Sequence, residues 1–199
     1  IATKPRWALG VLFGKRRTFG NLAGRTGESE GLKTLSEWIS QQFDPSATWK
    51  DVEWVRSRWP GRLIVKGILH PEDAGKAIAC GVDGIVVSNH GGRQLDGASA
   101  SITMLPRIAD VVQERCEILF DGGVQYGQDV LKALALGAKF CLVGRSTLYG
   151  TAAAGEAGAA RARALSRMHH SRSIATICLN LTSAASAEAV LIKGPPLGS

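Results

Sequence analysis

The chain has 199 residues, of which 45% are apolar and 21% charged, a composition typical of one globular domain. The formal charge of +7 is concentrated at the two ends, without the basic and aromatic surface along the folded core that nucleic-acid-binding proteins use, so nucleic acid is not expected as a partner. No stretch approaches the roughly 18 uninterrupted apolar residues of a membrane span, which excludes an integral membrane protein.

The first predicted element is a basic segment over residues 1–25, with six Lys or Arg and no acidic residue. Its sequence "KPRWALGVLFGKRRTFGNLAGR" interleaves these cations with Trp7, Phe13 and Phe19. Apolar insertion and attraction to anionic lipid would then act together, which predicts contact with a membrane surface. The alternative is a basic loop packed on the folded domain.

Four short apolar runs follow, at 62–69, 84–90, 117–123 and 139–145, each apolar on both faces. Such runs are typical of buried parallel strands. Helical patterns lie between them: "PEDAGKAIACG" begins with Pro71 at a first helical position, and "GQDVLKALALG" ends, like the first, on a glycine suited to a helix C-terminus. The unit is a strand followed by a helix, used four times.

A series of strand–helix units forms a parallel sheet, either open or closed into a barrel. Polar residues stand at the carboxyl end of every predicted strand: Lys66, Ser88, Asp121 and Arg145. Polar groups at all strand ends favour the mouth of a (β/α)8 TIM barrel, because an open sheet confines its ligand to one crevice. Four units make half of such a barrel and would leave the outer edges of the first and last strands unpaired.

Residues 159–199 have an atypical composition, rich in Ala, Arg and Ser with Glu188 as the only acidic residue, and we expect a basic tail without fixed structure. His169 and His170 within it have no Cys, Asp or Glu at metal-ligand spacing. Cys80, Cys116, Cys141 and Cys178 form no CxxC pair and are interpreted as reduced thiols. No metal site is expected.

The ten residues "SNHGGRQLDG", at 88–97, closely resemble the active-site signature of the FMN-dependent α-hydroxy-acid dehydrogenases and oxidases. Flanking matches, "QQFDPSATWKDVEWVRSRWPGRLIVKGIL" before it and "FDGGVQYGQDVLKALALGAKFCLVGR" after it, stand in the family's order. The resemblance covers about residues 1–158. It implies an α/β fold in which residues 26–158 form the second half of a TIM barrel, strands five to eight, and oxidation of an L-2-hydroxy acid of the lactate or mandelate type to the 2-oxo acid.

In that reaction His90 would act as the base, since imidazole titrates near neutral pH, and Arg93 would bind the substrate carboxylate through two parallel hydrogen bonds. The alternative is a capping histidine and a solvated arginine in a tight turn.

The resemblance further implies that FMN is held by side chains and bare backbone amides at the strand ends. Lys66 would lie beside the flavin ring and favour its reduced, anionic form. The alternative is that Lys66 merely extends into solvent from the end of its strand. The full expected set is Lys66, Ser88, Asp121, Gly122, Gly123, Gly144 and Arg145. Gln125 departs from the family, which usually has arginine there, and this weakens the expected phosphate site.

Because the chain begins at Ile1 and lacks the first-half strands, we expect a fragment of a cytoplasmic enzyme, at the inner face of the membrane and homo-oligomeric when complete. The alternative is a non-catalytic half-barrel that retains the motif but binds little or no FMN. The electron acceptor and the substrate's second substituent stay open.

Overall fold

A computed structural model describes residues 5–14, 46–167 and 189–193, and every structural statement below concerns these residues. The chain divides into two compact units, residues 1–47 and 48–199. In the first unit the described element is the helix α1 (Pro5–Leu12), whose residues Trp7, Leu9 and Leu12 are exposed, as is Phe13 just beyond it. None of the described helices combines the length and the hydropathy needed to cross a membrane.

The second unit is built on a parallel sheet with the strand order β4-β3-β2-β1-β5. Its strands are β1 (Arg62–Ile68), β2 (Gly84–Val87), β3 (Glu117–Asp121), β4 (Phe140–Leu142) and β5 (Ala189–Lys193). The four strands predicted from the apolar runs are confirmed, each ending earlier than its run. The four follow one another in space as they do in sequence, without a reversal of order.

The fifth strand, β5, was not expected. It pairs with β1 in parallel register, from Arg62 opposite Ala189 to Lys66 opposite Lys193. The expectation that the outer edge of β1 is unpaired is therefore wrong: residues near the end of the chain form its second ladder of backbone hydrogen bonds. At the opposite edge, β4 pairs only with β3 among the described residues.

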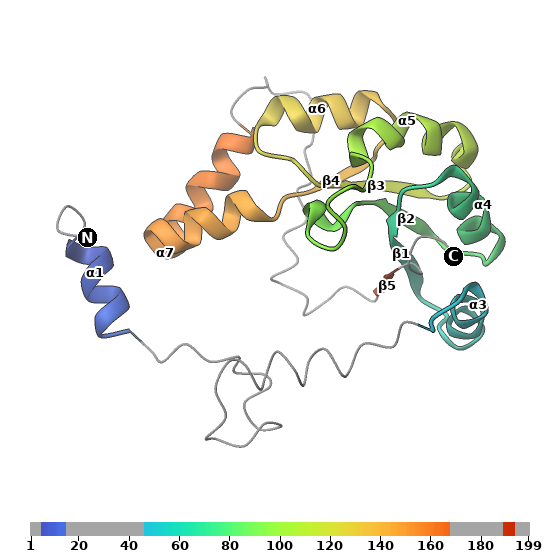
Figure 1. Cartoon of the computed structure of the whole chain (residues 1–199), viewed down its shortest axis with the longest axis horizontal. Coiled ribbons are helices and arrows are strands. Elements are labelled where there is room, and N and C mark those ends of the chain that lie inside the picture. The colour runs from blue at the N-terminus through green and yellow to red at the C-terminus, as the bar shows by residue number, and fades with distance from the viewer. Residues whose placement is uncertain (1–4, 15–45, 168–188, 194–199) are drawn as a thin grey trace, which may run out of the picture. The chain divides into compact units, whose positions relative to one another are not determined.

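Helices follow the strands in the predicted alternation: α4 (Pro71–Ala79), α5 (Ser101–Val112), α6 (Gly127–Ala135) and α7 (Arg145–Arg167), with α3 (Trp49–Arg58) before β1. Figure 1 shows α4, α5 and α6 along one face of the sheet. Helices on one face and strands in sequential order are the arrangement of a barrel segment, whereas a doubly wound sheet reverses its order and carries helices on both faces. The fold is thus an α/β fold consistent with part of a TIM barrel.

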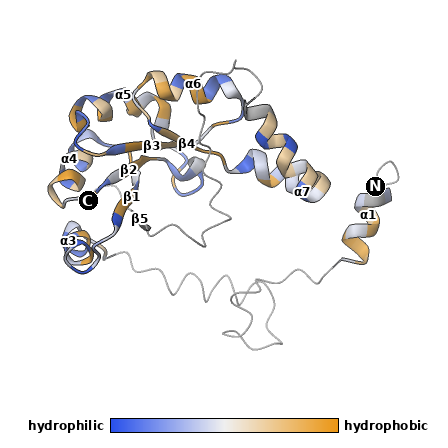
Figure 2. Cartoon of the chain, turned by 180° about the vertical axis from the view of Figure 1, so that it is seen from behind, coloured by the Kyte–Doolittle hydropathy of each residue, from blue (hydrophilic) through white to orange (hydrophobic). Residues whose placement is uncertain are grey.

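The hydrophobic core lies between the sheet and these helices (Figure 2). Strand residues Leu63, Val65, Ile85, Val87, Ile118 and Phe120 pack there against helix residues Ala74, Ala77, Leu105, Ile108, Val130 and Ala133. Because successive strand side chains alternate between faces, Ile64, Val86 and Leu119 point to the other face. Lys66 stands in register with Val86 and so belongs to this second face, opposite α4, α5 and α6.

Helix ends follow the sequence signals. Pro71 is the first residue of α4, and the Nδ1 atom of His70 accepts a hydrogen bond from the backbone N–H of Glu72 at 3.3 Å. Gly81, just past the C-terminus of α4, has φ +75°, a left-handed conformation that glycine adopts without steric cost. α7 bends at Ala154 and Gly155, where the backbone leaves helical geometry.

Candidate active site

Three of the polar residues predicted at the strand ends meet in one cluster. The hydroxyl of Ser88 donates to Asp121 Oδ2 at 2.6 Å and accepts from Lys66 Nζ at 3.1 Å. Lys66 also forms an ion pair with Asp121. The cluster joins the carboxyl ends of β1, β2 and β3, which the parallel sheet brings to one edge.

Burial makes this pairing energetically necessary. Ser88 is 2% exposed, and the side chains of Lys66 and Asp121 are 19% and 21% exposed. Removing a charge from water is costly unless an opposite charge and hydrogen bonds replace the lost hydration, and each member of the cluster supplies these to the others. Lys66 is therefore paired within the protein and does not extend into solvent.

The turn that follows β2 carries the predicted catalytic pair. Residues His90–Gly92 form a short 3-10 helix, η1, with φ values of 54°, 69° and 71°. Glycine tolerates such values, but a left-handed conformation costs a non-glycine residue roughly 1–2 kcal/mol. His90 is thus held in a strained backbone conformation, a feature that clusters at functional sites.

Local hydrogen bonds hold the turn in this shape. The backbone N–H of His90 donates to Ser88 Oγ at 3.0 Å, and that of Gly91 donates to Asn89 Oδ1 at 3.0 Å. The N–H of Gly92 donates to the carbonyl of Asn89, also at 3.0 Å. Ser88 therefore belongs both to the charged cluster and to the turn, and fixes one to the other.

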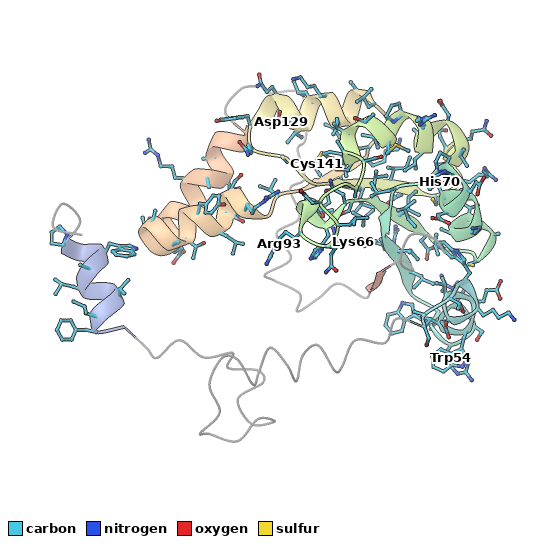
Figure 3. All side chains as sticks on the ribbon, in the orientation of Figure 1. Trp54, Lys66, His70, Arg93, Asp129 and Cys141 are labelled. Atoms are coloured by element: carbon cyan, nitrogen blue, oxygen red, sulfur yellow. The ribbon has the colours of Figure 1, made fainter. Side chains whose placement is uncertain are left out.

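His90 and Arg93 are both exposed. In the described part of the chain, Arg93 has no hydrogen bond or ion pair, so its five N–H donors are available to an anion. Figure 3 shows Arg93 and Lys66 on the side of the sheet away from α5 and α6. An anion could thus bind a permanent cation on the face of the sheet opposite α5 and α6.

The glycines of the expected phosphate site differ in their surroundings. A Cβ atom built on Gly123 or Gly144 would meet nothing within 4 Å, so packing does not require glycine at these two positions. A Cβ on Gly122 would lie 2.7 Å from Ser101 Oγ and 3.1 Å from Asn89 Oδ1, and its φ is +110°. Gly122 is therefore required for packing, whether or not a ligand binds.

Two contacts at this end were missed by the sequence analysis. The carboxylate of Asp129 accepts from the backbone N–H groups of Gln125 at 3.0 Å and Tyr126 at 2.9 Å, at the N-terminus of α6. A capping carboxylate occupies donors that a phosphate would otherwise use. The start of α7, next to Gly144, is the more open of the two helix ends. A carboxylate in the first turn of a predicted helix was the signal that could have identified this cap.

Arg145, the first residue of α7, donates from Nη2 to the carbonyl oxygen of Gly91 at 3.2 Å. The structure thereby connects the end of β4 with the turn after β2. Gln125, which replaces the expected arginine, is exposed and brings no charge.

The described cysteines lie outside the cluster of Lys66, Ser88 and Asp121. Cys80, Cys116 and Cys141 are free thiols. Burial raises the pKa of Cys80 and raises that of Cys116 to about 11, so both are protonated at neutral pH. Among the described residues no group of His, Cys, Asp and Glu could hold a metal ion. Cys178, His169 and His170 lie outside the described residues.

The sequential parallel strands, with Lys66, Ser88 and Asp121 clustered at their carboxyl ends, form an α/β fold consistent with part of a TIM barrel. The family model of the FMN-dependent dehydrogenases matches residues 1–191, and the chain belongs to this family.

Its relatives include enzymes acting on 2-hydroxy acids. An L-lactate dehydrogenase of Xanthomonas axonopodis pv. citri is 52% identical over 157 residues, which are 78% of this chain and 40% of the relative. One of Actinobacillus pleuropneumoniae serotype 5b is 50% identical over the same share of this chain and 41% of its own length. The chain thus spans about two fifths of the length of these relatives.

Solved structures of mandelate enzymes are also similar to this chain. A mandelate oxidase with (S)-2-phenylpropionate is 51% identical, with a TM-score of 0.58 over 61% of this chain and 36% of that one. The monotopic membrane protein (S)-mandelate dehydrogenase is 39% identical, with a TM-score of 0.71 over 82% of this chain and 43% of that one.

Proposed function

We propose that this chain provides the substrate-binding half of an enzyme that oxidises an L-2-hydroxy acid to the 2-oxo acid with FMN. The observation that carries the proposal is the turn after β2, which is bonded through Ser88 to the cluster with Lys66 and Asp121. The turn holds His90 in a strained conformation and carries Arg93, which makes no hydrogen bond or ion pair with the described residues. Strain of this kind persists only where the surrounding contacts impose it, and here it positions the two groups that the chemistry needs.

His90 is assigned the role of base and Arg93 that of carboxylate ligand. Oxidation of a 2-hydroxy acid requires the loss of a proton and two electrons, and imidazole accepts a proton near neutral pH. The guanidinium of Arg93 can bind both carboxylate oxygens at once and so fix the substrate's orientation. Substrate specificity of the lactate or mandelate type is supported by the names of the relatives.

FMN would accept the two electrons. The residues present fit this cofactor in chemistry. Lys66 would offer a cation to the flavin, with Ser88 and Asp121 as polar partners. Gly123 and Gly144, which have open space at their Cβ positions, and the cation Arg145 would bind the phosphate. Gly122 would contribute indirectly, because its close packing on Ser101 and Asn89 fixes the loop after β3. We assign β1 to β4 to the fifth to eighth strands of the barrel, since polar residues at these strand ends stand in the family's order.

The basic segment of residues 1–25 is proposed to lie on the cytoplasmic face of a membrane. The exposed Trp7, Leu9 and Phe13 of the described part support this, as does the monotopic membrane character of the related mandelate dehydrogenase. The complete enzyme is proposed to be a homo-oligomer.

A second candidate is a half-barrel without catalysis. It is favoured by Gln125, which removes one cation from the phosphate site. FMN titration separates the candidates: flavin fluorescence that is quenched on binding, together with bleaching by L-lactate or (S)-mandelate, supports the enzyme. A chain that never takes up flavin, even when supplied with the missing half, supports the alternative.

A further inference from the structure

The turn after β2 contains several hydrogen bonds of its own. The N–H groups of His90, Gly91 and Gly92 bond to side-chain or backbone oxygens of Ser88 and Asn89, which lie within the same turn. These bonds determine the shape of the turn. Its base is anchored to the sheet through Ser88, and a contact from a distant element would restrict its direction further.

Arg145 provides that contact. Its Nη2 donates to the carbonyl oxygen of Gly91 at 3.2 Å, across 54 positions of sequence. The guanidinium also packs directly on the turn, because a Cβ atom on Gly91 would lie 3.1 Å from Nη2 and 3.5 Å from Cζ of Arg145. A side chain at Gly91 would therefore crowd the guanidinium.

We propose that Arg145 is a positioning residue for the catalytic turn: it holds the Gly91 carbonyl and thereby fixes His90 and Arg93 relative to the end of β4. The term catalytic turn rests on the proposed function. Arg145 has five N–H donors and uses one of them on Gly91, so the role is compatible with binding a cofactor phosphate. A single side chain would then connect the cofactor site with the groups that act on the substrate.

Two neighbouring glycines offer a matched pair of variants. Gly91 and Gly92 have nearly the same backbone conformation, with φ of 69° and 71°, so alanine costs a similar backbone strain at both. They differ in that a Cβ on Gly92 would meet nothing within 4 Å. Any extra effect of Gly91→Ala over Gly92→Ala therefore reports the contact with Arg145.

The first experiment is a double-mutant cycle on the 199-residue chain, followed by urea unfolding. Gly91→Ala is expected to lower the unfolding midpoint more than Gly92→Ala. In an Arg145→Met background the two alanine variants are expected to have equal effects, since the guanidinium is gone. Equal effects already in the original background would overturn the proposal.

The second experiment measures amide hydrogen exchange by NMR. A residue that only stabilised the whole fold would change exchange throughout the sheet and not in the turn alone. Arg145→Met is expected to speed exchange at His90, Gly91 and Gly92 about tenfold, while β1 and β2 amides keep their rates. Arg145→Lys, which retains a donor, should restore part of the protection. Arg161→Met, an exposed arginine on the same helix, is the control for lost charge.

Unchanged exchange in the turn of Arg145→Met, or a change shared by the whole sheet, contradicts the positioning role. Neither experiment requires flavin or substrate. Their failure would leave the proposed oxidation intact, and failure of the oxidation assay would leave the contact intact.

Discussion

Ser88 Oγ and Asp121 Oδ2 lie 2.6 Å apart and connect the carboxyl ends of two adjacent strands, β2 and β3. Ser88 Oγ also accepts a hydrogen bond from the backbone N–H of His90, so one buried hydroxyl connects the charged cluster with the turn. A change in the cluster should therefore affect both the stability of the sheet and the geometry of the turn.

Asp121→Asn is expected to lower the free energy of unfolding by on the order of 2 kcal/mol, because it leaves the ammonium of Lys66 partly buried without its counter-charge. Urea unfolding measures the change. Asp110→Asn, an exposed position on α5, is the matched control and should have little effect. Equal midpoints for the two variants would show that the pair contributes nothing.

His90→Ala should reduce turnover on the order of 10²- to 10⁴-fold while flavin stays bound, since the imidazole is assigned to substrate chemistry. The variant belongs in a longer protein that contains this segment together with the preceding barrel strands. Steady-state kinetics and the flavin absorbance give both quantities. A variant with near-normal turnover would refute the role of His90 as base.

Arg93→Lys should chiefly weaken substrate binding, raising KM roughly tenfold, equivalent to about 1.4 kcal/mol, because an ammonium cannot reproduce a two-pronged carboxylate contact. Folding should not change, as Arg93 makes no hydrogen bond or ion pair with the described residues. The same longer protein and a 2-hydroxy acid serve for the assay. An unaltered KM would assign the carboxylate to another group.

The segment of residues 1–25 should bind vesicles that contain anionic lipid, and binding should weaken as salt is added, because its six cations act through screened electrostatics. Co-sedimentation of the chain with and without this segment is the measurement. Neutral vesicles provide the control. If deletion of residues 1–25 leaves salt-sensitive binding intact, the membrane contact lies elsewhere or does not exist.

The 199-residue chain alone should bind FMN weakly and show no turnover. It spans about two fifths of its relatives, and Gln125 supplies no charge to the phosphate. A fluorescence titration gives the affinity, with Gln125→Arg as the variant expected to bind more tightly. Stoichiometric tight binding, with bleaching by lactate, would be the contrary result.

Local sequence patterns predicted the four strands β1 to β4, two helices and the polar residues at the strand ends. These features depend on the spacing of apolar residues and on the composition of short segments, so they can be recognised locally. The contact of Arg145 with Gly91 and the packing of Gly122 on Ser101 depend on where distant loops meet, which no local pattern specifies. The cap at Asp129 was local and could have been recognised.

The strand β5 illustrates the same limit, since its apolar residues stand in a segment whose composition predicted no fixed structure. Pairing with β1 requires the alignment of two segments from opposite ends of the folded unit. Their register cannot be read from either segment alone.

The pairing of β1 with β5 also imposes an order of events on folding. β5 pairs with β1 although β2, β3 and β4 stand between the two in the chain. Until β5 docks, the edge of β1 that it covers lacks this ladder of N–H and C=O hydrogen bonds, and unpaired strand edges are prone to associate with other chains. Because closing so long a loop is slow, β5 should dock on β1 after β1 has paired with β2.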